Sequence, residues 1–208
     1  MDSMLCAAML ILAHANPPGS VSERLKNDKV AVTEFTLKPG EAQRVEGRYP
    51  AITVYLDGGA LEFTPYDGQP DPITVKSGDV VFSAARAGEI KNRGVSGIKF
   101  VRTEFLTNGD DATWGTAGLS PNYKLLIENR YTRTYDIKIP ARGSEPQHTH
   151  RARVVICLSG AALRHTMPDG RVEPSTLETG EIAWRSGGTH IGQNLGNTNL
   201  WVIAVEPK

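Results

Sequence analysis

The chain has 208 residues, enough for one large domain or two small ones, and its 23 basic residues balance its 23 acidic ones. This balance, without a cluster of basic residues, excludes a typical nucleic-acid-binding surface. The longest apolar run, residues 5–13, is about half of the roughly 20 residues that a membrane-spanning helix needs, so no membrane span is expected.

The first predicted element is a secretory signal peptide at residues 1–15. The apolar run is followed by Ala13-His14-Ala15, the pattern of small residues at which signal peptidases cut. The segment before the run contains an acid and no lysine or arginine, so the alternative is an apolar N-terminal arm that packs on the protein. A cleaved signal predicts a secreted or periplasmic protein, and its absence a cytoplasmic one.

Short strands fill most of the remaining chain. They are rich in β-branched and aromatic residues and are bounded by turn formers such as Asp67-Gly68 and Asp169-Gly170. No segment has the pattern of a long amphipathic helix, although residues 121–129 suit a helical turn or a strand. This pattern predicts an all-β protein, a sandwich or a barrel. The predicted strands are 30–37, 51–56, 61–64, 80–83 and 98–105, then, after a connection at 107–121, 134–139, 154–158, 163–167, 182–184 and 200–205.

The two groups of strands are copies of each other. Shifting the sequence by 102 positions superimposes a set of identical residues, among them Leu61 on Leu163 and Gly78 on Gly180. Repeat arrays have periods of roughly 20–50 residues, so this longer period indicates a duplicated domain. We therefore predict two modules, at residues 22–110 and 122–208.

Three histidines distinguish the second copy. His148 and His150 are two positions apart, which places both side chains on one face of a strand. His190, from a later strand, could complete a group of three imidazoles, and neutral imidazole suits Zn, Fe, Cu and Ni. In the first copy no metal is expected, because the equivalent residues are Glu46, Arg48 and Gly88.

These residues resemble the two sequence motifs of the cupin superfamily. The first motif, G-x5-H-x-H-x3/4-E-x6-G, is matched by Gly143, His148, His150 and Gly160. The second, G-x5-P-x-G-x2-H-x3-N, is matched by Gly180, Gly188, His190 and Asn194. The whole chain is thus similar to a bicupin, with two tandem jelly-roll (double-stranded β-helix) barrels and a degenerate motif in the first. The resemblance implies one divalent transition metal (Fe, Mn, Ni, Cu or Zn) on His148, His150 and His190, and none in the first barrel. It is also compatible with a homodimer, since open sheet edges invite pairing.

One departure from the motif changes the expected chemistry. Cupin sites usually take a fourth ligand from a glutamate, but Arg153, Val154 and Val155 occupy the positions where it would fall. An arginine beside a metal is repelled by it, yet it can bind a substrate carboxylate through two hydrogen bonds. If the apolar residues Val154 and Ile156 point into the barrel, Arg153 instead faces solvent. The pattern of apolar residues in the first copy favours this second orientation.

Four residues are candidates for binding a small-molecule substrate. Arg153 would pair with an anion, His165 and Trp184 would wall the pocket, and Gln193 lies close to His190 in the sequence. A set of three histidines without a carboxylate resembles the ligand set of thiol dioxygenases and of some dicarbonyl-cleaving cupins. The resemblance therefore implies a metal-dependent enzyme of dioxygenase or isomerase type. The alternatives are a non-enzymatic cupin that binds or senses a small ligand, anionic ligands included, and a structural or storage bicupin.

Overall fold

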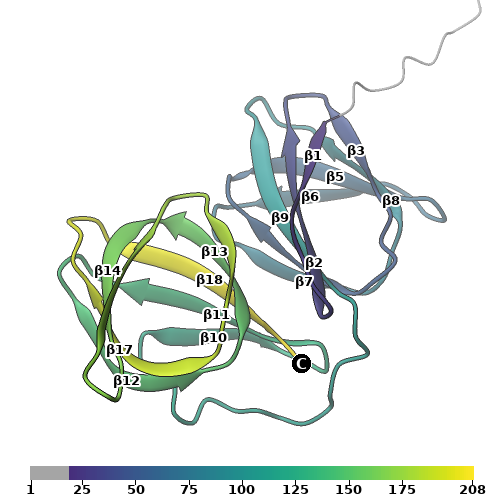
Figure 1. The fold of residues 1–208 in the computed structure, drawn as a ribbon. Helices are drawn as coiled ribbons and strands as arrows, with labels where there is room; N and C mark the ends of the chain where they lie inside the picture. The colour runs from purple at the N-terminus through teal and green to yellow at the C-terminus, as the bar shows by residue number, and fades with distance from the viewer. Residues whose placement is uncertain (1–18) are drawn as a thin grey trace, which may run out of the picture.

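The computed structural model describes residues 19–208. These residues form strands joined by turns and loops, and the strands fold into two barrels that lie side by side (Figure 1). The predicted signal peptide at residues 1–15 lies outside the described residues. Between residues 19 and 208 there is no helix long and apolar enough to cross a membrane.

The first barrel has a five-stranded sheet with the order β1-β2-β9-β4-β7 and a four-stranded sheet with the order β3-β8-β5-β6. Every strand pair in it is antiparallel. Its strands are β1 (Ser20–Lys26), β2 (Val30–Leu37), β3 (Ala42–Val45), β4 (Ala51–Tyr55), β5 (Gly59–Pro65), β6 (Asp71–Val75), β7 (Val80–Ser83), β8 (Gly88–Asn92) and β9 (Ile98–Phe105).

The second barrel repeats this topology, with sheets in the order β10-β11-β18-β13-β16 and β12-β17-β14-β15. Its pairs are also antiparallel. Its strands are β10 (Tyr123–Glu128), β11 (Thr132–Ile139), β12 (Ser144–His150), β13 (Arg153–Ser159), β14 (Ala161–Thr166), β15 (Val172–Leu177), β16 (Ile182–Arg185), β17 (Gly188–Asn194) and β18 (Leu200–Pro207).

Equivalent strands begin the same distance apart in the sequence. β2 begins at Val30 and β11 at Thr132, and β9 begins at Ile98 and β18 at Leu200, so both offsets equal the 102 positions of the sequence repeat. The all-β prediction is correct. Sequence patterns missed the strands with many exposed residues, such as β1 and β6, because the apolar alternation is weak there. Residues 121–129, which suited a helix or a strand, contain β10.

Each barrel has its own apolar interior. In the first barrel the stacked rings of Phe35 and Phe100, with centroids 4.8 Å apart, and the nearby ring of Tyr55 occupy the centre. In the second barrel the repeat-equivalent positions hold the smaller side chains of Ile137, Val202 and Cys157, while two tyrosines lie at other positions of its interior. Because aromatic rings fill more volume than aliphatic side chains, this difference leaves room for a cavity in the second barrel.

A third apolar cluster joins the two five-stranded sheets. Repeat-equivalent residues from both barrels meet there, for example Ile52 with Val154 and Val54 with Ile156. These residues were expected to line the barrels, and that expectation is wrong. β4 and β13 are buried on both faces, one toward the barrel interior and one toward the other barrel, so the apolar alternation gave no sign of which face was which.

The segment between the barrels, residues 106–122, contains no strand and runs along the second barrel (Figure 1). The indole of Trp114 stacks on the Arg151 guanidinium, whose central carbon lies 3.9 Å from the ring centroid. Gly118 accepts a backbone hydrogen bond from Thr149, between His148 and His150. The connection therefore supports β12, the strand that carries two of the candidate ligands.

A contact across the barrel interface gives a prediction for two equivalent glycines. Gly78 and Gly180 both have a positive φ, near 86°, but a methyl group on Gly78 would overlap the Trp201 ring, whereas one on Gly180 would meet open space. Trp201 cannot move freely, because its indole N–H donates to Asp136 at 2.7 Å. Gly180→Ala should cost about 1 kcal/mol of unfolding free energy through backbone strain. Gly78→Ala should cost about 1–3 kcal/mol more through overpacking.

Urea unfolding of the two variants measures this difference directly. Equal losses of stability for Gly78→Ala and Gly180→Ala would contradict the packing of Trp201 on the first barrel.

Candidate metal centre

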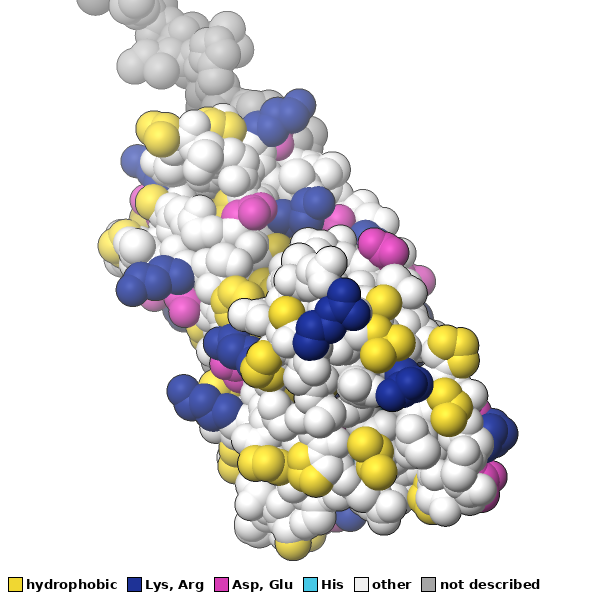
Figure 2. Space-filling view, turned by 90° about the vertical axis from the view of Figure 1, so that its left-hand side faces the viewer, with side chains coloured by type: hydrophobic (Ala, Val, Ile, Leu, Met, Phe, Trp, Pro, Cys, Tyr) yellow, Lys and Arg dark blue, Asp and Glu magenta, His cyan; other side chains and the backbone are white. Residues whose placement is uncertain are grey.

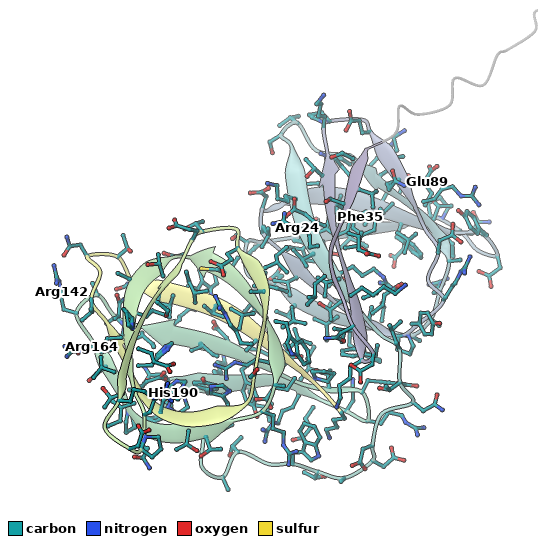
Figure 3. The ribbon with its side chains drawn as sticks, viewed as in Figure 1. Arg24, Phe35, Glu89, Arg142, Arg164 and His190 are labelled. Atoms are coloured by element: carbon teal, nitrogen blue, oxygen red, sulfur yellow. The ribbon has the colours of Figure 1, made fainter. Side chains whose placement is uncertain are left out.

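Three imidazoles, those of His148, His150 and His190, converge inside the second barrel. His190 is labelled within this barrel in Figure 3. His148 and His150 alternate along β12 and point inward, and His148 lies directly opposite His190 of β17 in the strand register. The ring centroids of His148 and His190 are 4.7 Å apart, and those of His150 and His190 are 5.0 Å apart. One ring nitrogen from each residue lies within 4.8 Å of the other two, which is close enough for one cation to contact all three.

The hydrogen bonds of two rings fix the tautomer that a metal needs. His148 Nδ1 lies 3.0 Å from the Pro146 carbonyl oxygen, and His150 Nδ1 lies 3.1 Å from that of Arg151. A carbonyl only accepts, so each Nδ1 carries the proton and each Nε2 presents a lone pair. His150 Nε2 is buried and has no hydrogen-bond partner. Ligating histidines typically donate their second nitrogen to such an acceptor, so the residues present fit a metal ion.

Burial keeps these imidazoles neutral. It lowers the pKa of His150 and of His190 to about 3, and it lowers the pKa of His148 as well. The positive charge of Arg153 lowers all three pKa values further. A group with a lowered pKa is uncharged at neutral pH, and the neutral form is the one that binds a metal.

A carboxylate that the sequence patterns did not predict lies beside the triad. Glu145 of β12 is 5% exposed, and its Oε1 lies 3.5 Å from His148 Nε2. Three positions separate the two residues, so in a regular strand they would face opposite ways. A bulge between Glu145 and His148 adds one residue and turns both side chains inward. Glu145 can therefore help to hold a cation, and burial raises its pKa to about 7.

The position of Glu145 depends on a glycine across the sheet. Gly192 lies opposite Glu145 in the register, and a methyl group there would overlap Glu145 Oε1. Gly188, on the same strand, has open space around its Cα. Gly192→Ala should displace the carboxylate and weaken Mn(II) binding on the order of 10-fold, the effect of losing a supporting group near a metal.

The matched control for this prediction is Gly188→Ala, which should bind Mn(II) like the unmodified protein. Calorimetric titration of both variants compares them, and a similar loss in each would show that Glu145 does not matter to the site.

A cavity of about 350 Å³ adjoins the triad. Its wall includes His150 and His190, the carboxylate of Glu145, and Arg153 at the start of β13, and apolar atoms supply most of its surface. Arg153 is 8% exposed and points into the barrel. Of the two orientations that the sequence left open for Arg153, the structure has the inward one, because Val154 and Ile156 pack against the other barrel and turn Arg153 inward.

No protein-family model matches the sequence, and no curated protein matches it. Solved structures, however, resemble almost the whole chain. AerE from Microcystis aeruginosa has 14% sequence identity and a TM-score of 0.62, over 93% of this chain and 98% of that one. A cupin 2 conserved barrel domain protein from Leptotrichia buccalis has 14% identity and a TM-score of 0.60, over 95% and 92%.

The oxalate decarboxylase of Bacillus subtilis, a protein with Mn(II) centres, has 12% identity and a TM-score of 0.59, over 92% of this chain and 73% of that one. The chain has a double cupin fold. At these identities the likeness concerns the fold alone, and the chemistry has to be argued from the residues of this chain.

Of the other predicted pocket residues, two border the cavity and one lies between the barrels. His165 lines the cavity and stacks on His190, with ring centroids 4.5 Å apart, but it is not one of the three clustered ligands. Trp184 packs in the cluster between the barrels, because it lies opposite the outward-facing Val154; its assignment to the pocket wall is wrong. Gln193 borders the cavity, but its side-chain oxygen accepts a hydrogen bond from the exposed Arg164.

The first cupin barrel has different groups at the equivalent positions. Glu46 and Arg48 have side chains that are 65% and 75% exposed and that lie 3.7 Å apart as an ion pair. Gly88, at the position equivalent to His190, leaves no side chain. The charged groups at these positions therefore face solvent rather than the interior of the barrel.

Proposed function

We propose that the second barrel is the metal-dependent site of an enzyme that acts on a small organic molecule. The observation that carries this proposal is the cluster of His148, His150 and His190, whose ligand atoms lie within 4.8 Å of one another next to a cavity of about 350 Å³. Ligand cavities in proteins span roughly 300–1,000 Å³, so the cavity suits a small substrate.

The residues around the cavity have distinct roles in this proposal. His148, His150 and His190 would hold a divalent transition metal, which when bound supplies Lewis acidity or, if redox-active, dioxygen chemistry of dioxygenase type. The aliphatic wall excludes water. Glu145 Oε2 has no hydrogen-bond partner and can hold a proton or accept one from a substrate. Tyr123, whose hydroxyl lies 3.2 Å from His148 Nε2, keeps its proton because burial raises its pKa to about 12.

One observation favours a second candidate, a cupin that binds its ligand without converting it. Arg153 places a fixed positive charge in the same cavity, where cupins usually have an acidic ligand. A cation beside the triad opposes metal binding and favours an anion. In this case the cavity would bind a small acid, and metal would be dispensable.

Substrate conversion separates the two candidates. Protein loaded with Mn(II) or Fe(II) is incubated with short-chain keto, hydroxy and unsubstituted carboxylic acids, while proton NMR follows the acids and an oxygen electrode follows dioxygen. An enzyme should convert at least one acid, and His190→Ala should abolish the conversion. Dioxygen consumption would mark an oxygenase, and conversion without it a non-oxidative reaction, with a product of unchanged composition marking an isomerase. Acids that bind but stay unchanged with either metal would rule out the enzyme and leave the binding protein.

A further inference from the structure

Arg153 is a buried cation without a matching anion. Its side chain lies inside the second barrel, and its Nε and Nη1 atoms are buried and have no hydrogen-bond partner. No ion pair to Arg153 is present among residues 19–208. Buried charged groups are normally paired, because leaving donors of a guanidinium unsatisfied costs free energy. The unpaired nitrogens therefore indicate a ligand that supplies the missing acceptors.

The neighbouring charges do not compensate Arg153. Arg185 lies opposite Arg153 in the strand register and also borders the cavity, but it has its own partner, Glu181, at 2.7 Å. Glu145 shares the cavity, and the charge of Arg153 counteracts the rise in its pKa, but the two groups form no ion pair; the guanidinium carbon instead lies 5.4 Å from the centroid of the Tyr123 ring. The charge of Arg153 lowers the pKa of His165 as well as those of the three clustered histidines, so its field extends over the whole site.

The other groups of the wall restrict which anion fits. Apolar atoms supply most of the wall surface, and the aliphatic residues that contribute include Ile139, Val155, Leu163, Leu177 and Val202. The carboxylate of Glu145 also borders the cavity and, when ionised, would repel a second negative charge on the ligand, whereas the other carboxylate of the wall, Glu173, is paired with Arg171. The cavity thus favours one carboxylate on an apolar body over a dicarboxylate or a sugar.

We infer that the second barrel binds a small monocarboxylic acid with an apolar body, whose carboxylate pairs with the guanidinium of Arg153. This inference deepens the proposed function, on which it rests for the location of the substrate. A planar guanidinium offers parallel N–H groups that match the two oxygens of a carboxylate, and a lysine at the same position would offer only a point charge. Arg153 would thus select the substrate class.

Hexanoate and hexanamide are suitable probes, since they share an apolar chain and differ in charge. Calorimetric titration is carried out on chelator-treated protein and on Mn(II)-loaded protein. Hexanoate should bind to the unmodified protein, and hexanamide and oxalate should bind at least about 10-fold more weakly. Arg153→Met should weaken hexanoate binding about 10–100-fold, which is the effect of losing hydrogen bonds to a charged group. Arg153→Lys should fall in between. Arg164→Met, at an exposed arginine on the neighbouring strand β14 (Figure 3), should bind like the unmodified protein.

The unfolding temperature adds a second readout. Arg153→Met removes an unpaired buried charge, so the ligand-free variant should be at least as stable as the unmodified protein, whereas loss of a purely structural arginine would lower its stability. The inference is overturned if hexanoate fails to bind either form of the protein, if hexanamide or oxalate binds as well as hexanoate, or if folded Arg153→Met keeps its affinity. Should the protein bind no metal yet bind hexanoate through Arg153, the enzyme proposal fails and this inference stands.

Discussion

His150→Ala is expected to abolish tight metal binding. His150 Nε2 is a buried acceptor without a partner, and the ring is held in place by the hydrogen bond from Nδ1 to the Arg151 carbonyl. Removing this ligand leaves two imidazoles, so the affinity for Mn(II) should fall by more than the roughly 10–100-fold that accompanies loss of a mere supporting group. Calorimetric titration with Mn(II) measures the loss, and circular dichroism confirms that the variant is folded.

His165→Ala is the matched control for this expectation. His165 is an imidazole in the same cavity and stacks on His190, yet it lies outside the cluster of three ligands. Its removal should weaken Mn(II) binding by less than about 10-fold. If His165→Ala is as damaging as His150→Ala, or if His150→Ala retains the metal, the assignment of the ligands is wrong.

Glu206→Gln is expected to have the largest effect on stability. Glu206 and Arg133 are opposite each other on β18 and β11, and the pair is buried, with side chains 0% and 6% exposed. Two guanidinium nitrogens donate to Glu206 Oε2 at 2.7 and 2.9 Å. Arg133 also donates to the Gly115 carbonyl of the connecting segment. Neutralising Glu206 leaves Arg133 as an uncompensated buried cation, which typically costs about 3–5 kcal/mol.

Urea unfolding provides the comparison for this pair. Glu181→Gln breaks the exposed pair with Arg185 and should cost about 1 kcal/mol or less, because solvent screens such pairs. Replacing both buried partners, as Arg133→Met with Glu206→Leu, should recover most of the stability lost in Glu206→Gln. A loss no greater for Glu206→Gln than for Glu181→Gln would contradict the structural role of the buried pair.

The sequence was most informative where a pattern depends on local geometry. The repeat and the turn formers predicted an all-β chain of two modules, because hairpin turns need particular residues such as Asp169-Gly170. The alternation of His148 and His150 placed both imidazoles on one face, since a regular strand has a period of two. His190 was assigned through its place in the second motif, and the structure brings it within reach of the other two.

The sequence failed where contacts with other elements decide the geometry. Glu145 was missed because a bulge between Glu145 and His148 reverses which side chains of β12 point inward, and no residue pattern predicted this bulge. Trp184 was assigned to the wrong face because its strand β16 pairs with β13, which is buried on both sides, and the orientation of Arg153 stayed open for the same reason. The faces of such a strand follow from tertiary packing and not from its own sequence.

The space-filling view of the second barrel's outer side shows basic, acidic and apolar side chains interspersed, without one extended patch of a single charge (Figure 2). The charge distribution that matters to the proposed function is thus the internal one. There, neutral imidazoles, one carboxylate beside them and the unpaired Arg153 share one cavity. This combination supports a site that takes up a cation and an anion together.

The number of metal ions bound per chain tests the account most directly. The protein is stripped with a chelator, loaded with Mn(II), desalted and analysed by inductively coupled plasma mass spectrometry. Three imidazoles in the second barrel, and exposed Glu46 and Arg48 at the equivalent positions of the first, predict one Mn(II) per chain. A protein that retains no Mn(II), or that retains two ions per chain, would contradict a single metal centre on His148, His150 and His190.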